Sequence, residues 1–338
     1  TTLFRSANKD VIANYLYGDD GMALNIYRYN IGGGSKDIEG VDQYWELDRL
    51  TESFLKGETY SGTTHDDLMA FVSNPANYDF TKDKGAQDFL KASYALGNIN
   101  EVVLFVNSPH YLMTKNGKCR NDDGAGRIDN LDSSNYDVFA KYLMVITKHF
   151  VDEGYPVKYI SPINEPQWPW DANKQEGCHY EPASCAACLN AVATELKAFN
   201  SSNGTNIKID GFESGSWRWN NKDNPSYIDQ YVSNIQSYDY YSDMDYISFH
   251  SYSNPYSRKR REEFMKNIAS YNIQVGMSEY CQMTSGVNLN EFRNAQFLTL
   301  VMSYDMSILK SNEWIYWIGV SNEKTYNYED GLIYTNWW

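Results

Sequence analysis

The chain has 338 residues, 42% of them apolar, which is enough to build a sizeable core in one large barrel or in two ordinary domains. Its formal net charge of −15 argues against nucleic acid and anionic membranes as partners, because both would repel it. The sequence contains no apolar run of about 18 residues, so we expect no membrane-spanning helix.

Short apolar runs alternate with amphipathic segments along the chain. A predicted helix at 8–17 comes first and has no strand before it. Predicted strands follow at 23–31, 101–107, 157–163, 207–212, 245–250, 274–278 and 313–318. Predicted helices lie between them at 83–96, 136–151, 183–199, 225–235, 259–269 and 289–309. Several strands are continuous apolar runs, which is typical of parallel strands covered on both faces.

This alternation predicts an α/β fold with a parallel sheet and right-handed crossovers. A doubly wound open sheet should carry a glycine-rich loop that opens a helix. The glycine run at 32–34 is instead followed by a polar loop, which makes it a poor phosphate cradle. We therefore expect a (β/α)8 TIM barrel. With seven candidate strands, this barrel is expected to lack its first strand.

In barrels of this kind, chemistry takes place where the strands end and the following loops begin. Polar, carboxylic and aromatic residues close all of the predicted strands: Arg28 and Asn30, the segment 107–111, Asn164 and Glu165, Glu213 and Ser214, the segment 250–252, Glu279 and Tyr280, and Trp317. Chance placement would scatter such residues to both strand ends. The pattern predicts a functional site at the carboxyl ends of the strands.

Two of these residues, Glu165 and Glu279, are expected to face each other across the barrel mouth from strands four and seven. Pro166 favours extended backbone at Glu165, which would hold its side chain at the strand tip. Glycoside cleavage needs two carboxyl groups in different protonation states. A single glutamate is more often solvated surface, but two at equivalent strand ends favour a catalytic pair.

Four neighbouring residues have plausible roles beside this pair. Arg28 would hold Glu279 ionised and oriented. Asn164 would hydrogen-bond the sugar hydroxyl next to the anomeric carbon, or else cap a turn. His250 and Tyr252 end the sixth strand, where a contact with a sugar or a carboxylate is favoured over a core role.

Aromatic residues form 15% of the chain, including 29 Tyr and 9 Trp. Tyr and Trp present an apolar face and a hydrogen-bonding edge, which suits sugar rings, although extra aromatics can also fill a core. Trp317 is expected to form the floor or wall of the central sugar site. Other candidates for substrate contact, which could equally pack the loops together, are Tyr111, Trp168, Trp170, Trp217 and Trp219.

The five cysteines allow more than one interpretation. Cys185 and Cys188 form a C-x2-C pair with Cys178 and His179 just upstream, which is a possible zinc site. The segment from Pro182 onward also has the pattern of a helix start, where cysteines three apart share one face. A disulfide from Cys178 to this helix is therefore favoured over a metal, and an odd count leaves at least one free thiol.

Several motifs together resemble glycoside hydrolase family 30, especially its endo-β-1,6-galactanase-like branch. The likeness runs from about Met22 to Trp338 and rests on these segments: LNIYRYNIGGG at 24–34, NSPHYLM at 107–113, NEP at 164–166, QEGCH at 175–179, ISFHSY at 247–252 and SE at 278–279. The resemblance implies Glu165 as general acid/base and Glu279 as nucleophile. It also implies a central sugar site formed by Arg28, Asn164, His250 and Trp317.

Members of that family usually carry a first strand and a β-sandwich built from both chain ends. We therefore expect residues 1–338 to be one catalytic barrel domain that lacks both features and is cropped at both ends. This sequence has His110 and Leu112 where the family has a proline and an aromatic residue, which bears on the substrate.

The leading hypothesis is a retaining hydrolase of a β-linked polysaccharide or oligosaccharide, ranked as β-1,6-galactan, then β-1,6-glucan, then xylan. The alternatives are a non-catalytic carbohydrate-binding barrel and a metal-dependent hydrolase using His250 and His110, although the sequence has no H-x-H or HExxH motif. We expect a monomer without cofactor or metal. A secreted or cell-surface location is expected, although no signal peptide is visible at Thr1.

Overall fold

The computed structural model describes residues 6–38, 49–172, 174–216, 227–252, 254–282, 292–322 and 330–335. The strands are β1 (Ile26–Ile31), β2 (Glu101–Val106), β3 (Val157–Ser161), β4 (Lys208–Ile209), β5 (Glu213–Ser214), β6 (Tyr246–His250), β7 (Gln274–Tyr280), β8 (Trp314–Tyr316), β9 (Val320–Asn322) and β10 (Ile333–Thr335). The helices are α1 (Ser6–Tyr17), α2 (His65–Ser73), α3 (Lys84–Tyr94), α4 (Tyr136–Asp152), α5 (Pro182–Asn203), α6 (Tyr227–Ile235), α7 (Arg258–Ile268) and α8 (Phe292–Tyr304).

Parallel strands form one curved wall through the centre of the fold. Their order is β1-β2-β3-β4 and then β5-β6-β7-β8. The short strands β4 and β5 are successive parts of one segment, in which β4 pairs with β3 and β5 pairs with β6. The backbone N–H of Glu213 also donates to the carbonyl of Ile163 at 2.9 Å, which connects the two halves. This confirms the predicted barrel-like α/β fold. The strand expected at 207–212 is found as the shorter β4, and β5 follows just beyond its predicted end.

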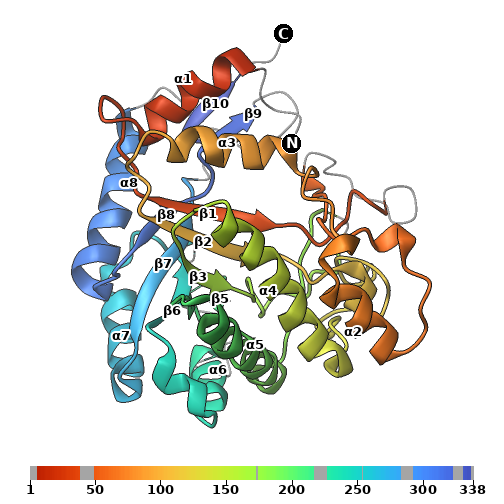
Figure 1. The fold of residues 1–338 in the computed structure, drawn as a ribbon. Coiled ribbons are helices and arrows are strands. Elements are labelled where there is room, and N and C mark those ends of the chain that lie inside the picture. The colour runs from red at the N-terminus through yellow and green to blue at the C-terminus, as the bar shows by residue number, and fades with distance from the viewer. Residues whose placement is uncertain are drawn as a thin grey trace.

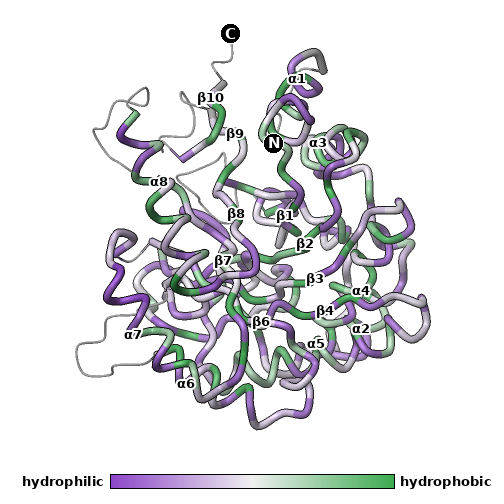
Figure 2. The backbone as a smooth tube through the Cα atoms, turned by 90° about the vertical axis from the view of Figure 1, so that its left-hand side faces the viewer, coloured by the Kyte–Doolittle hydropathy of each residue, from purple (hydrophilic) through white to green (hydrophobic). Residues whose placement is uncertain are grey.

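Helices cover the outside of this wall. Figure 1 shows α4, α5, α6 and α7 around the strands, with α1 and α3 side by side. Every residue of β6, and all but the first of β2, is buried, because both faces of these strands are covered. Figure 2 shows hydrophobic segments in the strand layer, for example at β2, and hydrophilic segments at the periphery. Each large apolar side chain buried in this way stabilises the fold by roughly 1.5–3 kcal/mol.

The local differences from the predicted elements have identifiable causes. Strand β1 begins at Ile26 because Ala23 has left-handed backbone, with φ of 49°. Helix α2 was not predicted, although Thr64 and Asp67 form a reciprocal capping box at its start. The predicted helix at 289–309 is found as α8 plus a π-helical turn, while residues 289–291 and 225–226 lie outside the described residues. No described helix is both long and apolar enough to cross a bilayer.

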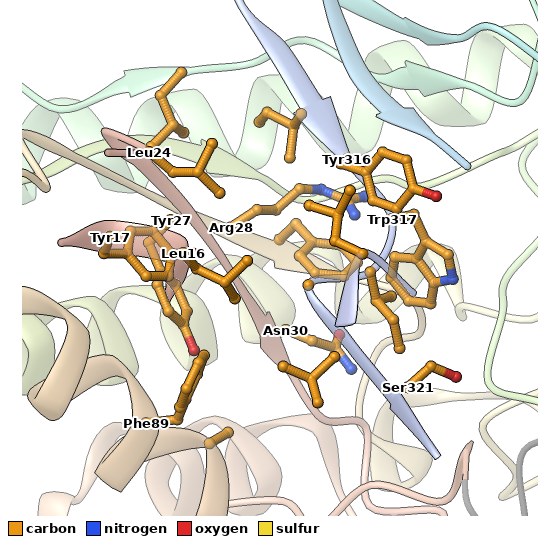
Figure 3. A pocket seen from close by; sticks show the side chains of 18 of the residues that line it. Leu16, Tyr17, Leu24, Tyr27, Arg28, Asn30, Phe89, Tyr316, Trp317 and Ser321 are labelled. Atoms are coloured by element: carbon orange, nitrogen blue, oxygen red, sulfur yellow. The ribbon is translucent and has the colours of Figure 1, made fainter. Parts of the chain in front are cut away.

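Strands β1 and β8 flank a cavity of about 470 Å³. In the described part of the chain, no hydrogen-bonded ladder joins these two strands. Side chains from α1, β1, α3 and β8 line the cavity. Figure 3 shows Leu16 and Tyr17 on one side of it and Tyr316 and Trp317 on the other, with Arg28 between them. The cavity therefore reaches from the outer helices towards the guanidinium of Arg28, which lies among the candidate site residues.

Candidate active site

The structure brings Glu165 and Glu279 together at the carboxyl ends of the strands. Glu165 follows β3, and Glu279 lies near the end of β7. One oxygen of each carboxylate and one ring nitrogen of His250 all lie within 4.8 Å of one another. The two glutamate side chains are only 13% and 12% exposed. Two carboxylates thus face a common space at the mouth of the barrel, although their residues are far apart in the sequence.

Arg28 is the cation that joins strand β1 to this pair. Its Nη1 donates to Glu279 Oε2 at 3.0 Å, and its Nη2 donates to Asn164 Oδ1 at 3.3 Å. The guanidinium carbon lies 3.4 Å from the centre of the Phe105 ring, so the planar group is held against an aromatic face. Asn164 in turn donates to Asn107 Oδ1 at 3.0 Å. Arg28 and Asn164 therefore have fixed orientations beside the two carboxylates.

A third carboxylate, Glu213, lies beside the pair, and no sequence pattern indicated a specific role for it. It is fully buried in β5 and accepts from Arg28 Nη2 at 2.7 Å and from Ser161 Oγ at 2.6 Å. Its Oε2 also lies 3.3 Å from His250 Nε2. Burial alone would raise the pKa of Glu213, but Arg28, His250 and Ser161 lower it to about 2. Its position at the end of a predicted strand was the available signal.

His250 connects this buried carboxylate to Glu165. It is completely buried at the end of β6, and its Nδ1 lies 2.8 Å from Glu165 Oε1. Burial opposes a charge on the imidazole, yet the carboxylates of Glu279, Glu165 and Glu213 outweigh it and raise the pKa of His250 to about 10. Tyr252 donates its hydroxyl to Glu279 Oε1 at 2.9 Å. His250 and Tyr252 thus contact carboxylates. A contact with a carboxylate or with a sugar was expected for them.

The backbone of Glu165 corrects one expectation. Pro166 was expected to favour extended backbone at this residue, but Glu165 is left-handed, with φ of 46°. Its N–H donates to the carbonyl of Glu213 at 2.7 Å, and its carbonyl accepts from Trp170 Nε1 at 3.1 Å. A non-glycine residue in this region costs on the order of 1–3 kcal/mol, so these bonds overcome the local preference. The turn that results aims the carboxylate towards His250.

The aromatic candidates occupy different environments. Trp317 follows β8, lines the cavity beside Arg28 and meets Phe105 edge-on at 6.5 Å. Trp168 is 42% exposed, and its Nε1 and the Glu165 carboxylate both lie beside Gly215, where an added Cβ would approach each within 3.0 Å. Trp170 packs against Gly177. Trp217 and Trp219 lie outside the described residues.

Tyr111 is placed in loop packing rather than in the carboxylate cluster. It is buried, its ring lies 4.2 Å from that of His110, and its edge and hydroxyl lie beside Gly34 and Gly57. His110 is also buried, and its Nδ1 accepts from the N–H of Leu112 at 3.2 Å. Burial lowers the pKa of His110 to about 3. Among the described residues, His110 is also not part of the group with metal-ligand spacing that contains His250, as a metal-dependent hydrolase using both would require.

The expected disulfide from Cys178 is wrong. All five cysteines are buried and none of them forms a disulfide, and burial raises the pKa of Cys178 to about 12. His179 lies 3.1 Å from the carbonyl of Trp168 and 3.3 Å from Glu181, so its two ring nitrogens already have partners. Cys185 and Cys188 begin helix α5 as packed apolar groups, which is how a buried neutral thiol behaves.

Within the described residues, one group of three His, Cys, Asp or Glu side chains has the spacing of metal ligands: Glu165, His250 and Glu279. Each of them already has a partner in the protein: Arg28 and Tyr252 donate to Glu279, and His250 bonds directly to Glu165. We therefore interpret the group as a hydrogen-bonded carboxylate pair rather than as metal ligands.

Comparison with known proteins identifies the family of this chain. A model described as O-glycosyl hydrolase family 30 matches residues 3–334. The chain is 28% identical over 183 residues to an endo-β-1,6-galactanase of Hypocrea rufa, a match that covers 53% of this chain and 36% of that protein. It is 28% identical over 167 residues to an exo-β-1,6-galactobiohydrolase of Bifidobacterium longum, covering 44% and 11%.

A solved structure shares the fold of this chain. A conserved exported protein from Bacteroides fragilis has a TM-score of 0.75 to this chain at 25% identity, with 94% of this chain and 66% of that chain covered. With respect to the galactanase of Hypocrea rufa, the chain spans only about a third of that protein's length. Because the family match covers nearly the whole sequence, the protein belongs to O-glycosyl hydrolase family 30.

Proposed function

We propose that this protein hydrolyses β-glycosides with retention of configuration, with Glu165 as general acid/base and Glu279 as nucleophile. The observation that carries this proposal is the approach of the two carboxylates, whose oxygens lie within 4.8 Å. Retaining enzymes hold their carboxyl groups about 5–5.5 Å apart, whereas inverting enzymes need about 6.5–9.5 Å to admit a water. The separation in this site therefore favours direct attack by a carboxylate.

The two half-reactions use these residues in opposite senses. In the first, a Glu279 oxygen bonds to the anomeric carbon, the glycosidic C–O bond breaks, and Glu165 gives its proton to the leaving oxygen. In the second, water bonds to the same carbon, the ester bond to Glu279 breaks, and the Glu165 carboxylate takes the proton from water. Arg28 and Tyr252 donate hydrogen bonds to the Glu279 carboxylate and restrict its rotation, so the nucleophile is held in place for attack.

The surrounding residues fit the binding of sugars on both sides of the cleaved bond. Asn164 lies between Arg28 and Asn107, where its amide can reach the hydroxyl next to the anomeric carbon. Trp317 would form a wall of the central sugar site. Trp168 lies on the Glu165 side and exposes its ring, so we place the leaving-group sugar against it. Tyr111 is buried in loop packing, which makes a direct contact with substrate the weakest of these assignments.

The substrate proposed first is β-1,6-linked galactan, because the two curated relatives are an endo-β-1,6-galactanase and an exo-β-1,6-galactobiohydrolase. β-1,6-Glucan and then xylan follow as alternatives. The test is a panel of these three polysaccharides, with NMR used to identify the anomer that is released first. Galactan is expected to give the largest kcat/KM and a β product. An α product first would reject the retaining mechanism, and normal glycan affinity without turnover would favour a carbohydrate-binding barrel.

The finer architecture is also a proposal. An eighth parallel strand fits between β8 and β1, since these two strands flank an apolar cavity and, in the described residues, share no ladder. Each of them is already paired in parallel on its other side, with β7 and β2 respectively. A strand in that place would complete an eight-stranded barrel. The single domain over 1–338, the missing sandwich, secretion and the monomeric state stay predictions from the sequence.

A Gly215→Ala substitution is expected to lower kcat by about 10–100-fold, because catalysis is sensitive to small displacements of a reacting group. The added methyl would lie 2.9 Å from Glu165 Oε1 and 2.8 Å from Trp168 Nε1, so the carboxylate or the ring must move. Initial rates and the thermal unfolding midpoint should be measured together. A variant with wild-type kcat would show that neither group needs its present position.

A further inference from the structure

The buried carboxylate of Glu213 contacts two residues, Arg28 and His250, that themselves contact the proposed catalytic pair. Its Oε1 accepts from Ser161 and from Arg28 Nε, at 2.6 and 3.3 Å. Its Oε2 accepts from Arg28 Nη2 at 2.7 Å and lies 3.3 Å from His250 Nε2. Its side chain is fully buried, so it does not reach substrate. Any effect of this carboxylate on the reaction must therefore pass through its partners, and Arg28 and His250 are the partners that also contact Glu279 and Glu165.

The two nitrogens of His250 face carboxylates on opposite sides of the ring. Nε2 lies 3.3 Å from Glu213 and Nδ1 lies 2.8 Å from Glu165. A neutral imidazole has one donor and one acceptor nitrogen, whereas an imidazolium has two donors. An ionised Glu213 can only accept, so Nε2 must carry a hydrogen in either state. The second proton then lies between Nδ1 and Glu165, on one atom or the other.

We propose that Glu213 is a positioning residue that fixes the Nε2–H form of His250, so that His250 and Glu165 hold one transferable proton between them. This inference rests on the proposed function of Glu165 as general acid/base. In the first half-reaction the shared proton moves to the leaving oxygen, which leaves a neutral His250 beside an ionised Glu165. In the second half-reaction the proton taken from water restores the pair.

The other charged groups around the pair are consistent with this role. Arg28 from β1 faces Glu213, and Glu279 from β7 lies 3.7 Å from His250 Nδ1. Two further acids, Asp210 and Glu313, lie near Glu213. Burial raises the pKa of Glu313 to about 8 and that of Asp210 well above its usual range, which disfavours a charge on either group. Tyr252 meets the His250 ring edge-on at 5.9 Å and is uncharged.

The net charge of the site follows from this arrangement. In the proposed mechanism the carboxylates of Glu213 and Glu279 carry two negative charges and Arg28 carries one positive charge. The pair of His250 and Glu165, which holds one shared proton, is neutral in sum. One net negative charge therefore surrounds the anomeric carbon, which becomes positive in the transition state. Transfer of the shared proton to the leaving oxygen, together with esterification of Glu279, leaves the protein groups with the same net charge. Loss of the Glu213 charge would remove this complementarity and lower the proton affinity of the pair of His250 and Glu165.

The direct test measures the protonation state of His250 in the wild-type chain. It uses ¹⁵N NMR of the two ring nitrogens in the absence of substrate. The chain has five histidines, and a spectrum of a His250→Gln variant assigns the relevant signals. Nε2 is expected to stay protonated from pH 5 to pH 9, with a pKa well above the ordinary value of about 6.5. A His250 that titrates near 6.5, or whose neutral form carries its proton on Nδ1, overturns the proposal.

A Glu213→Gln variant tests the cause of this behaviour. Loss of the negative charge is expected to lower the pKa of His250 by about 1–3 units and to move the basic limb of the pH profile of kcat/KM down by a similar amount. Glu213→Asp should restore part of both shifts. Asp210→Asn is the matched control, because it removes a buried carboxyl of the same barrel whose hydrogen bond is to Ser248; its His250 should titrate as in wild type.

The two readouts separate this inference from the proposed function. An active enzyme in which Glu213→Gln leaves both the His250 pKa and the pH profile unchanged overturns the role of Glu213 alone. A wild-type chain that shows the expected His250 spectrum but cleaves none of the glycosides contradicts the proposed function instead. If Glu213→Gln does not fold, the wild-type ¹⁵N titration still decides the state of His250.

Discussion

A Glu279→Gln variant is expected to lose glycosidase activity by a factor on the order of 10⁴–10⁶ in kcat. The amide has nearly the size of the carboxylate and can still accept from Tyr252, but it cannot attack the anomeric carbon. Arg28 keeps Glu213 as an ionic partner at 2.7 Å, so the substitution does not leave that buried cation unpaired. We therefore expect the loss to fall on chemistry, with little change in the thermal unfolding midpoint.

The nucleophile can also be identified by trapping. A 2-deoxy-2-fluoro glycoside with a good leaving group should add one fluorosugar to the wild-type chain, on the peptide that contains Glu279, and none to the variant. Glu263→Gln on α7 is a suitable control, because this glutamate is about half exposed and lies 3.8 Å from Lys259, away from the site. Full activity in Glu279→Gln, or a label on another residue, would refute the assignment.

The sequence was most informative where the chain is buried. The apolar runs ending at Glu165, His250 and Glu279 predicted parallel strands, and parallel strands deliver their last residues to one end of the sheet. The meeting of these three side chains is therefore a consequence of strand direction, which a sequence pattern can reveal. Asn164 joins them for the same reason, since it follows β3, whereas Arg28 lies within β1 and its long side chain extends to Glu279.

Features set by tertiary contacts were harder to predict. Pro166 biases the residue before it, but the hydrogen bond from Glu165 N–H to Glu213 overrides that bias. Glu213 was recognised as a residue at a strand end, yet its role depends on the break between β4 and β5, which turns it inward against Arg28. Neither contact leaves a pattern in the sequence near it.

Loop residues and cysteines show the same limit. Tyr111 follows a strand, as substrate-contacting residues of barrels do, but the loop that it belongs to folds back on Gly34 and Gly57 and buries it. The spacing of Cys185 and Cys188 is shared by zinc sites, disulfides and ordinary helix faces. The tertiary structure decides between them, because Cys185 and Cys188 form no disulfide and, among the described residues, belong to no group with metal-ligand spacing.

A Glu165→Gln variant is expected to lose activity on substrates whose leaving group needs a proton, and to keep the first step on substrates whose leaving group does not. On a polysaccharide, whose leaving sugar needs a proton, kcat/KM should fall by about 10²–10⁴-fold, the usual contribution of general acid catalysis. On a dinitrophenyl glycoside the leaving group departs without a proton, so formation of the glycosyl-enzyme should be nearly unaffected. Hydrolysis of the glycosyl-enzyme should still be slow, because no base is left to activate water. A burst of dinitrophenolate is therefore expected.

Azide provides the second half of this test. It attacks the anomeric carbon without transferring a proton, so it should restore turnover of the dinitrophenyl substrate and give a β-glycosyl azide. Glu181→Gln is the matched control, since Glu181 precedes α5, is 56% exposed at its side chain and is 3.3 Å from His179. Equal losses on both substrates, or no effect of azide, would mean that Glu165 shapes the site without transferring the proton.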